Sequence, residues 1–379
     1  MVLRIFGLSF AVTIVSLIVA AIYGGPQAVL LVLILSILEI SLSFDNAVIN
    51  ATVLRRMSDF WQKIFLTVGI VIAVFGMRLV FPLVIVWLAS GLGPVAALDL
   101  ALNPPADGAA YFPDGSASYE TLLTDAHPQI AAFGGMFLLM LFLGFILEER
   151  EITWLSWLEK PLARAGKLDQ LAVVIAGVLL LITAAYIAPE DTVSTVMIAG
   201  VLGMVTYIAV NGLGELFNTP EEGEDGEIVE GSGGPTALAK ATGKAGFFLF
   251  LYLEVLDASF SFDGVIGAFA ITSDPIIIAL GLGFVGAMFV RSITVFLVRK
   301  GTLSDYVYLE HGAHWAIGAL AVILLVSIGY HVNENVTGLV GVALIGAAFI
   351  SSIIRNRKAA AAVGTLDDDV DEQQSVPVG

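Results

Sequence analysis

Two short stretches of this sequence decide its fold: residues 38–45 (LEISLSFD) and residues 256–263 (LDASFSFD). Aligned position by position, they share five identities and one exchange of Glu for Asp. Duplicated helices that merely pack well together are the simpler explanation. What is repeated here is polar, however, inside two strongly apolar stretches. The sequence therefore predicts an internal repeat that carries function.

The surroundings of the two stretches extend the repeat. Each is followed by an apolar stretch with a single arginine, Arg78 or Arg291, and then by a further apolar stretch. The chain has ten apolar stretches near the roughly 20 residues that cross a bilayer: 5–24, 27–54, 63–91, 129–148, 170–188, 193–213, 244–271, 275–298, 313–331 and 336–354. The copies begin five stretches apart, an odd number, so they would cross the membrane in opposite directions. Such inverted repeats are typical of transporters with a midplane substrate site.

The composition places the whole chain in the membrane class. Of 379 residues, 58% are apolar and 13% charged, with a mean hydropathy of +0.93, whereas soluble domains have about 25% charged residues. The formal charge of −17 argues against nucleic acid as a partner, which would need a basic face. Because cysteine is absent, disulfides and thiolate ligands are excluded. No Walker-type, His-Glu-x-x-His or Gly-x-Ser-x-Gly motif indicates an enzyme.

The basic residues predict the orientation. Outside the apolar stretches they fall in alternate loops: Arg4; Arg55, Arg56 and Lys63; Arg150, Lys160, Arg164 and Lys167; Lys240 and Lys244; Arg299 and Lys300; Arg355, Arg357 and Lys358. Since such residues are retained on the cytoplasmic side, we expect a multi-pass protein of the plasma membrane with both termini cytoplasmic. The first stretch has a signal peptide as its alternative, but its length and the Gly24-Gly25-Pro26 connection favour a retained helix.

The predicted fold class is all-α: a polytopic membrane protein of about ten transmembrane helices with two inverted three-helix repeats. Its parts are a first helix (1–26), repeat 1 (27–148) with an extracytoplasmic loop (91–128), two linking helices (149–213), an acidic cytoplasmic linker (214–243), repeat 2 (244–331), a last helix (332–358) and a disordered acidic tail (359–379). Eleven of the 34 acidic residues lie in the part of the linker from 220 to 235 and in the tail. The charge of −17 is therefore mostly a property of these two segments.

Five carboxylates at membrane depth are the main indication of function. They are Glu39, Asp45, Glu254, Asp257 and Asp263. At about 2.5–3.5 kcal/mol for each ionised acid at the bilayer centre, five would cost on the order of 12–17 kcal/mol without partners. Arg78 and Arg291 can supply counter-charges for two, which leaves about three for bound cations or protons. Glu254 and Asp257 share a helix face, where like charges repel unless a cation or proton lies between them.

The helical period does not direct all five acids to one site. On an ideal helix Glu39 and Asp45 point about 120° apart, and Glu254 and Asp263 point nearly opposite. Either the motif helices are interrupted near residues 43–46 and 261–264, where serines can satisfy freed backbone groups, or the acids serve different contacts.

The donor atoms favour a hard cation. Carboxylates, serine hydroxyls and the Asn46 amide are oxygen donors, which suit Mg, Ca or Mn. Copper and zinc would normally require Cys or His, and the histidines fall in loops or near predicted helix ends, where an interfacial role is expected: His127, His311, His314 and His331.

At these residues the sequence resembles the TerC (tellurium-resistance) family of integral membrane proteins, within the lysine-exporter-like transporter superfamily. The likeness lies in Glu39 six residues before Asp45-Asn46, in Glu254-x-x-Asp257 before Asp263, and in the arginine-bearing stretch after each motif. Gly264 and Gly283 depart from the family pattern and suggest a divergent, uncharacterised branch. The resemblance implies metal-site residues at Glu39, Asp45, Asn46, Asp257 and Asp263, with Glu254 close by. It also implies roles in manganese efflux, tellurite resistance or metal supply to secreted enzymes.

Three hypotheses follow. The first is a secondary transporter that exports a divalent metal, manganese foremost, in exchange for protons, with no tightly bound cofactor. The second is a non-transporting membrane scaffold or stress-response hub whose acidic loops recruit soluble partners. The third, an exporter of amino acids or other organic solutes, is disfavoured by the acid-rich motifs.

Overall fold

The computed structural model describes residues 2–105, 109–168, 170–216, 241, 243–269, 271–272, 274–299, 306–332 and 334–374. Within them the structure is helical and contains no strand, so the predicted all-α polytopic class is confirmed. Most of the acidic linker, residues 217–240, and the chain end, 375–379, lie outside the described residues.

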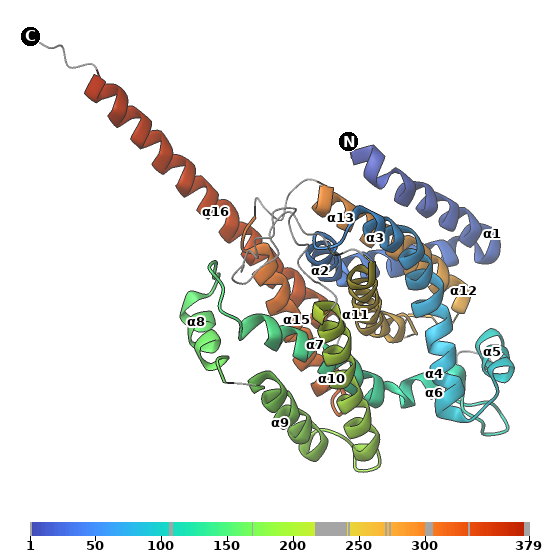
Figure 1. Ribbon diagram of the computed structural model, residues 1–379. Helices are drawn as coiled ribbons and strands as arrows, with labels where there is room; N and C mark the ends of the chain where they lie inside the picture. The colour runs from blue at the N-terminus through green and yellow to red at the C-terminus, as the bar shows by residue number, and fades with distance from the viewer. Residues whose placement is uncertain are drawn as a thin grey trace, which may run out of the picture.

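The helices of repeat 1 and of the segment after it follow one another along the chain, with longer connections before α6 and α8 (Figure 1). They are α1 (Val2–Leu42), α2 (Phe44–Leu54), α3 (Asp59–Ile64), the π-helical η1 (Phe65–Gly69) and η2 (Ile72–Val80), α4 (Phe81–Ser90), α5 (Pro94–Leu102), α6 (Tyr119–Asp125), α7 (His127–Ile146), α8 (Ser156–Ala165), α9 (Leu171–Tyr186) and α10 (Val193–Leu216). The predicted loop 91–128 thus holds two short helices. Ser118 begins the second of these, since its hydroxyl accepts a hydrogen bond from the Thr121 amide.

The second half repeats part of this order. It contains α11 (Gly243–Phe269), α12 (Pro275–Ile278), the π-helical η4 (Ala279–Gly286), α13 (Ala287–Arg299), α15 (Leu309–Ser327) and α16 (Glu334–Gln374). Asp274 begins α12, because its carboxylate accepts from the Ile276 and Ile277 amides. In both halves, therefore, the helix after the motif contains a π-helical segment. These segments are rare and are concentrated at functional sites.

Within the described residues, seven helices are long and apolar enough to cross a membrane. The difference from the ten predicted spans has three identifiable sources. The first two predicted spans form α1, which is counted once although it bends at Gly24 and Gly25, where Gly25 has a φ of +67°. The α9 helix has only 16 residues. The α11 helix has the length of a span, 27 residues, but is not among the seven. The connection predicted at Gly24-Gly25 is thus present as a sharp bend.

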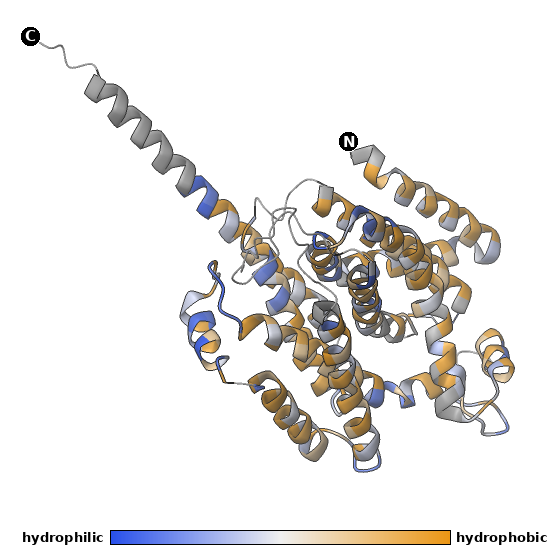
Figure 2. Cartoon of the chain, viewed as in Figure 1, coloured by the Kyte–Doolittle hydropathy of each residue, from blue (hydrophilic) through white to orange (hydrophobic). Residues whose placement is uncertain are grey.

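Burial separates central from peripheral helices. In α7, 72% of the most apolar 18-residue segment is buried. In the corresponding segments of α1 and α16 only 22% is buried. Large apolar side chains project outward from the peripheral helices, such as Ile22 (82% exposed), Tyr186 (81%) and Leu339 (68%). Figure 2 shows α1 and α9 as predominantly hydrophobic. Because soluble proteins rarely expose so much contiguous apolar surface, this surface is the one that faces lipid.

The two repeats are interlocked. The motif helix α1 packs against η4 of the other half, and the motif helix α11 packs against η2 of the first half. The α2 helix packs against α13, and the two π-helical segments η2 and η4 contact each other. Each motif helix therefore lies on the π-helical segment of the opposite repeat.

Two expectations about local structure need correction. A turn at Ser43 (φ −94°, ψ 13°) does separate α1 from α2, but α11 continues through residues 261–264 without a break. The segment 359–374, predicted as disordered, continues α16 as a helix. The alanine-rich run 359–362 has high helix propensity and extends a helix that has already formed.

Candidate functional site

A small cavity of about 30 Å³ lies between the repeats. Its polar lining comes from α2 (Asn50), α11 (Glu254 and Asp257) and α13 (Arg291 and Thr294), and its apolar lining includes Phe65, Leu66, Gly69, Ile70 and Ala73. The predicted pair of acids one helical turn apart thus faces a single cavity. Since about one probe sphere, some 10–15 Å³, is the minimum for a water molecule, the cavity has room for one or two waters or a single ion.

A buried hydrogen bond joins the two motifs at this place. The Asn46 side-chain amide donates to Asp257 Oδ1 over 2.8 Å, and both residues are nearly inaccessible, with exposures of 1% and 6%. A hydrogen bond to a charged group contributes about 1.5–3 kcal/mol. The bond holds α2 against α11 and fixes the orientation of the Asp257 carboxylate.

Glu254 occupies a different position. It is 5% exposed, and neither carboxylate oxygen accepts a hydrogen bond within the described residues. Its Oε1 lies against the backbone of Gly69 in η1, where an added Cβ would come within 2.7 Å. A buried ionised carboxylate without partners is costly, so Glu254 is the acid in this cavity that most requires a proton or a cation.

Glu39 makes the corresponding contact in the other half. It is 2% exposed and accepts a 2.7 Å hydrogen bond from the Ser43 hydroxyl at Oε1. A Cβ added to Gly286, at the end of η4, would lie 2.2 Å from Glu39 Cγ. In both halves a motif acid thus lies against a glycine of the opposite π-helical segment. Glu39 does not line the cavity at Glu254 and Asp257.

Arg291 links the cavity to the first repeat. Its Nε donates to the Leu66 carbonyl in η1 over 3.0 Å. This carbonyl belongs to a π-helical segment, where the regular α-helical pairing is altered. The arginine therefore holds α13 against η1 and brings positive charge to a cavity that contains two acids.

Three predicted residues are placed only by their backbone. Asp45 lies in α2, Arg78 in η2 and Asp263 in α11, but their side chains lie outside the described part of the structure. The structure therefore brings Asn46, Glu254, Asp257 and Arg291 together and puts Glu39 at a separate buried contact. Among the described residues, no three Asp, Glu or His side chains form a cluster that could hold a metal.

Two residues of the cavity were not predicted. Asn50 is 2% exposed, and its side-chain oxygen has no partner among the described residues. Thr294 is 1% exposed, and its hydroxyl donates to the Val290 carbonyl. The spacing in the sequence could have indicated both residues. Asn50 follows Asn46 by four residues and Thr294 follows Arg291 by three, so each lies on the same helix face as a polar residue that was predicted. With the two acids they make an oxygen-rich lining, which is the donor type of hard cations.

Two of the four histidines are buried in protein contacts that the sequence did not predict. His311 and His314 lie in the first turns of α15 and are 5% and 7% exposed. His314 stacks on Phe145 at 3.6 Å between ring centroids, and His311 Nδ1 lies 3.1 Å from Glu159 Oε2. Neither lines the cavity between the repeats. They pack instead against α7 and α8.

Fold and cavity together define an all-α, multi-pass membrane protein with buried carboxylates between its two halves. The chain belongs to the family described as "Protein of unknown function (DUF475)", whose model matches residues 44–359. That range includes every residue of the cavity. No curated protein and no solved structure matches the chain.

Proposed function

We propose that this protein is a secondary transporter that exports a divalent metal cation, manganese foremost, through the cavity between its repeats. The observation that carries the proposal is the pair Glu254 and Asp257, buried together in a cavity that also contains Asn50 and Thr294. Carboxylate, amide and hydroxyl oxygens suit Mg, Ca and Mn rather than softer metals.

The size of the cavity supports an ion over an organic solute. About 30 Å³ admits one or two waters or one ion, and not an amino acid. The preference for manganese comes from the resemblance of the two motifs to the TerC family. A membrane scaffold would have no use for a buried acid such as Glu254, whose oxygens accept no hydrogen bond within the described residues, whereas a carrier needs groups that bind and release a charge.

The architecture supports transport between two states. Each motif helix packs on the π-helical segment of the opposite half, so movement of one repeat against the other would change both acid–glycine contacts together. Protons are the proposed counter-ions, because a buried carboxylate such as Glu254 can carry either a proton or a share of a metal. Residues Asp45 and Asp263 are proposed as further ligands or protonation sites, with Arg78 and Arg291 as counter-charges. We place the protein in the plasma membrane with both termini in the cytoplasm.

Manganese uptake into inverted vesicles tests the proposal. Wild-type protein, Asp45→Asn and Asp263→Asn are measured side by side, with Asp125→Asn in the exposed end of α6 as the matched control. The two motif variants should lose uptake and the control should retain it. Equal flux in all four would falsify the assignment of these acids. Deletion of residues 220–235 should leave uptake intact; a scaffold predicts the reverse, with loss of function on deletion and none on the Asp→Asn changes.

A further inference from the structure

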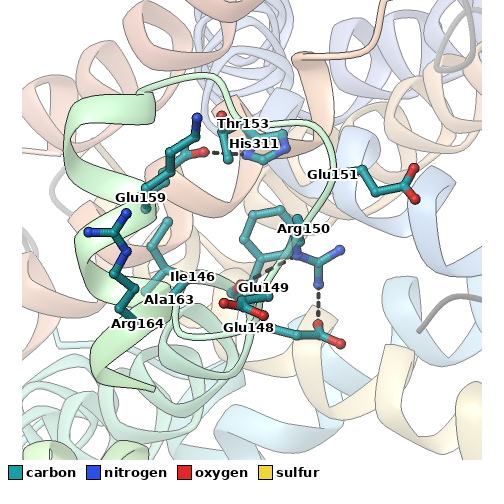
Figure 3. A pocket seen from close by; sticks show the side chains of 12 residues that line it. Ile146, Glu148, Glu149, Arg150, Glu151, Thr153, Glu159, Ala163, Arg164 and His311 are labelled. Atoms are coloured by element: carbon teal, nitrogen blue, oxygen red, sulfur yellow. Dashed lines mark hydrogen bonds and ion pairs between the residues drawn. The ribbon is translucent and has the colours of Figure 1, made fainter. Parts of the chain in front are cut away.

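A second and larger cavity, of about 390 Å³, lies away from the repeats. It is formed where α7 leaves the apolar bundle, by the segment 147–155, by α8 and by the start of α15 (Figure 3). Figure 1 places α8 at the edge of the molecule, between α7 and α9 along the chain, and Figure 2 shows it as more hydrophilic than both neighbours. Because α7 is a candidate membrane span and α9 is apolar, α8 lies at the boundary of the membrane.

Glu159 fixes the orientation of α8. Its carboxylate is 3% exposed and accepts hydrogen bonds from the Trp154 and Leu155 amides, at 3.0 and 3.2 Å, and from the Trp315 indole at 3.1 Å. His311 Nδ1 lies at 3.1 Å from the other side. These contacts attach the Glu159 side of α8 to α15. The opposite face of α8 therefore points away from α15.

The charges around the cavity are unevenly paired. Arg150 pairs with Glu148 at 2.6 Å and Lys167 with Glu149 at 3.0 Å. Arg150 also lies over the Phe145 ring, 3.9 Å from its centroid.

Three charged groups remain at the cavity without an ion pair to any other described residue: the cations Lys160 and Arg164 on α8 and the acid Glu151. The buried Glu159 carboxylate offsets the excess of one positive charge, so the cavity as a whole is balanced. The exposed groups at its mouth are two neighbouring cations on α8 and one acid, and the two cations are complementary to a single anion.

Exposed apolar side chains lie on α8 and just beyond its end. Trp157 is 76% exposed, and Lys160 and Arg164 follow it by three and seven residues, so the three share one face of α8. Leu168, just beyond the helix, is 65% exposed. Tryptophan with apolar and cationic neighbours is typical of the membrane interface, where the ring lies at headgroup level.

We propose that this cavity binds the headgroup of an anionic phospholipid, with Lys160 and Arg164 on the phosphate and Trp157 at the level of the glycerol backbone. A free phosphate would use the two cations but would have no use for Trp157 or Leu168. A neutral lipid would leave Lys160 and Arg164 without a counter-charge, and a zwitterionic lipid would bring its own ammonium group close to these two cations. The site is independent of the proposed transport, because none of its residues lines the cavity between the repeats.

Lipid titration of the purified full-length protein, followed by native mass spectrometry, tests the inference. The lipids are phosphatidylglycerol and phosphatidylcholine, and a parallel arm uses inorganic phosphate. The double variant Lys160→Ala/Arg164→Ala is compared with Arg357→Ala/Lys358→Ala, which removes two exposed cations from α16.

The expected result is a roughly thirtyfold loss of phosphatidylglycerol affinity in the α8 variant, since each Lys or Arg near an anionic surface contributes about 1 kcal/mol. The α16 control should bind as the wild type does. Trp157→Ser should weaken lipid binding while leaving any weak phosphate binding unchanged. Equal affinity of the α8 variant and the wild type overturns the site, as does equal preference for phosphatidylcholine. Phosphate that competes fully with the lipid overturns the lipid assignment.

Discussion

The side-chain amide of Asn46 donates to the carboxylate of Asp257 across 2.8 Å, and the two residues are 211 positions apart in the chain. They belong to the two copies of the repeated motif. One buried hydrogen bond therefore connects the halves of the molecule at the edge of the cavity that contains Glu254 and Asp257.

Replacement of Asn46 by Ala should weaken this connection. Asp257 Oδ1 would lose its 2.8 Å donor in a buried place, and an unsatisfied buried group costs about 1–3 kcal/mol, more when charged. We expect a lower thermal midpoint in detergent together with loss of manganese uptake. Asn103→Ala is the matched control, because Asn103 donates to the Asp99 carboxylate at an exposed site. Similar melting of both variants would contradict a structural role for the buried bond.

The glycines opposite the motif acids should resist enlargement. A Cβ would come within 2.7 Å of Glu254 Oε1 in Gly69→Ala and within 2.2 Å of Glu39 Cγ in Gly286→Ala. Overpacking of this kind costs about 1–3 kcal/mol. In Gly177→Ala on α9 nothing lies within 4 Å of the new Cβ, so this control should be neutral or gain about 0.5–1 kcal/mol from helix propensity. Thermal unfolding of the three variants checks whether Gly69→Ala and Gly286→Ala lower the stability more than Gly177→Ala does. An equal effect at all three positions would show that the close contacts with the acids do not matter for stability.

Glu254→Gln should separate binding from folding. The amide keeps the shape of the side chain but removes a charge that has no partner within the described residues. We expect an unchanged or higher thermal midpoint without metal, since a buried charge is costly, and no further rise on addition of manganese. Wild type should gain about 2.7 kcal/mol at a free metal concentration of 100 times Kd. Glu120→Gln, in α6, should behave as the wild type; an undiminished metal response in Glu254→Gln would show that this acid is not a ligand.

Glu159→Ala should release α8 from α15. Two backbone amides and the Trp315 indole would lose their acceptor, and we expect a loss of about 2–3 kcal/mol with faster proteolysis between residues 147 and 170. Glu149→Ala removes an exposed ion pair with Lys167, which contributes about 0–1 kcal/mol at most. Cleavage at the same rate in both variants would count against Glu159 as the attachment point.

The sequence predicted the parts of this fold that depend on apolar length and on polar residues in apolar surroundings. Glu254 and Asp257 were expected on one helix face, and both line the cavity. A connection between two helices was expected at Gly24-Gly25-Pro26, and the helix is interrupted there, where Gly25 adopts a positive φ. These features are local, since each follows from spacing or from the conformational freedom of a single residue.

What could not be predicted depends on contacts between distant segments. The pairing of Asn46 with Asp257 and of Arg291 with the Leu66 carbonyl requires knowledge of which helices meet. The π-helical segments have no simple sequence pattern, and Asn50 was overlooked because a single amide in an apolar stretch is a weak signal. The contact of His311 with Glu159 was not predicted either, because the two residues are 152 positions apart in the chain.

The π-helical segment η4 ends at Gly286, five residues before Arg291. Its hydrogen bonds run from i to i+5, so each turn contains one residue more than an α-helical turn. If η4 tightened to α geometry, the surplus residue would pass along the helix, and every residue after it would rotate by about 100° around the axis. Arg291 would then leave the Leu66 carbonyl and the cavity without any rigid-body movement of its helix. The same change in η2 would turn the backbone that carries Arg78, so the helix after each motif can reorient its arginine-bearing segment by a shift of one residue in register.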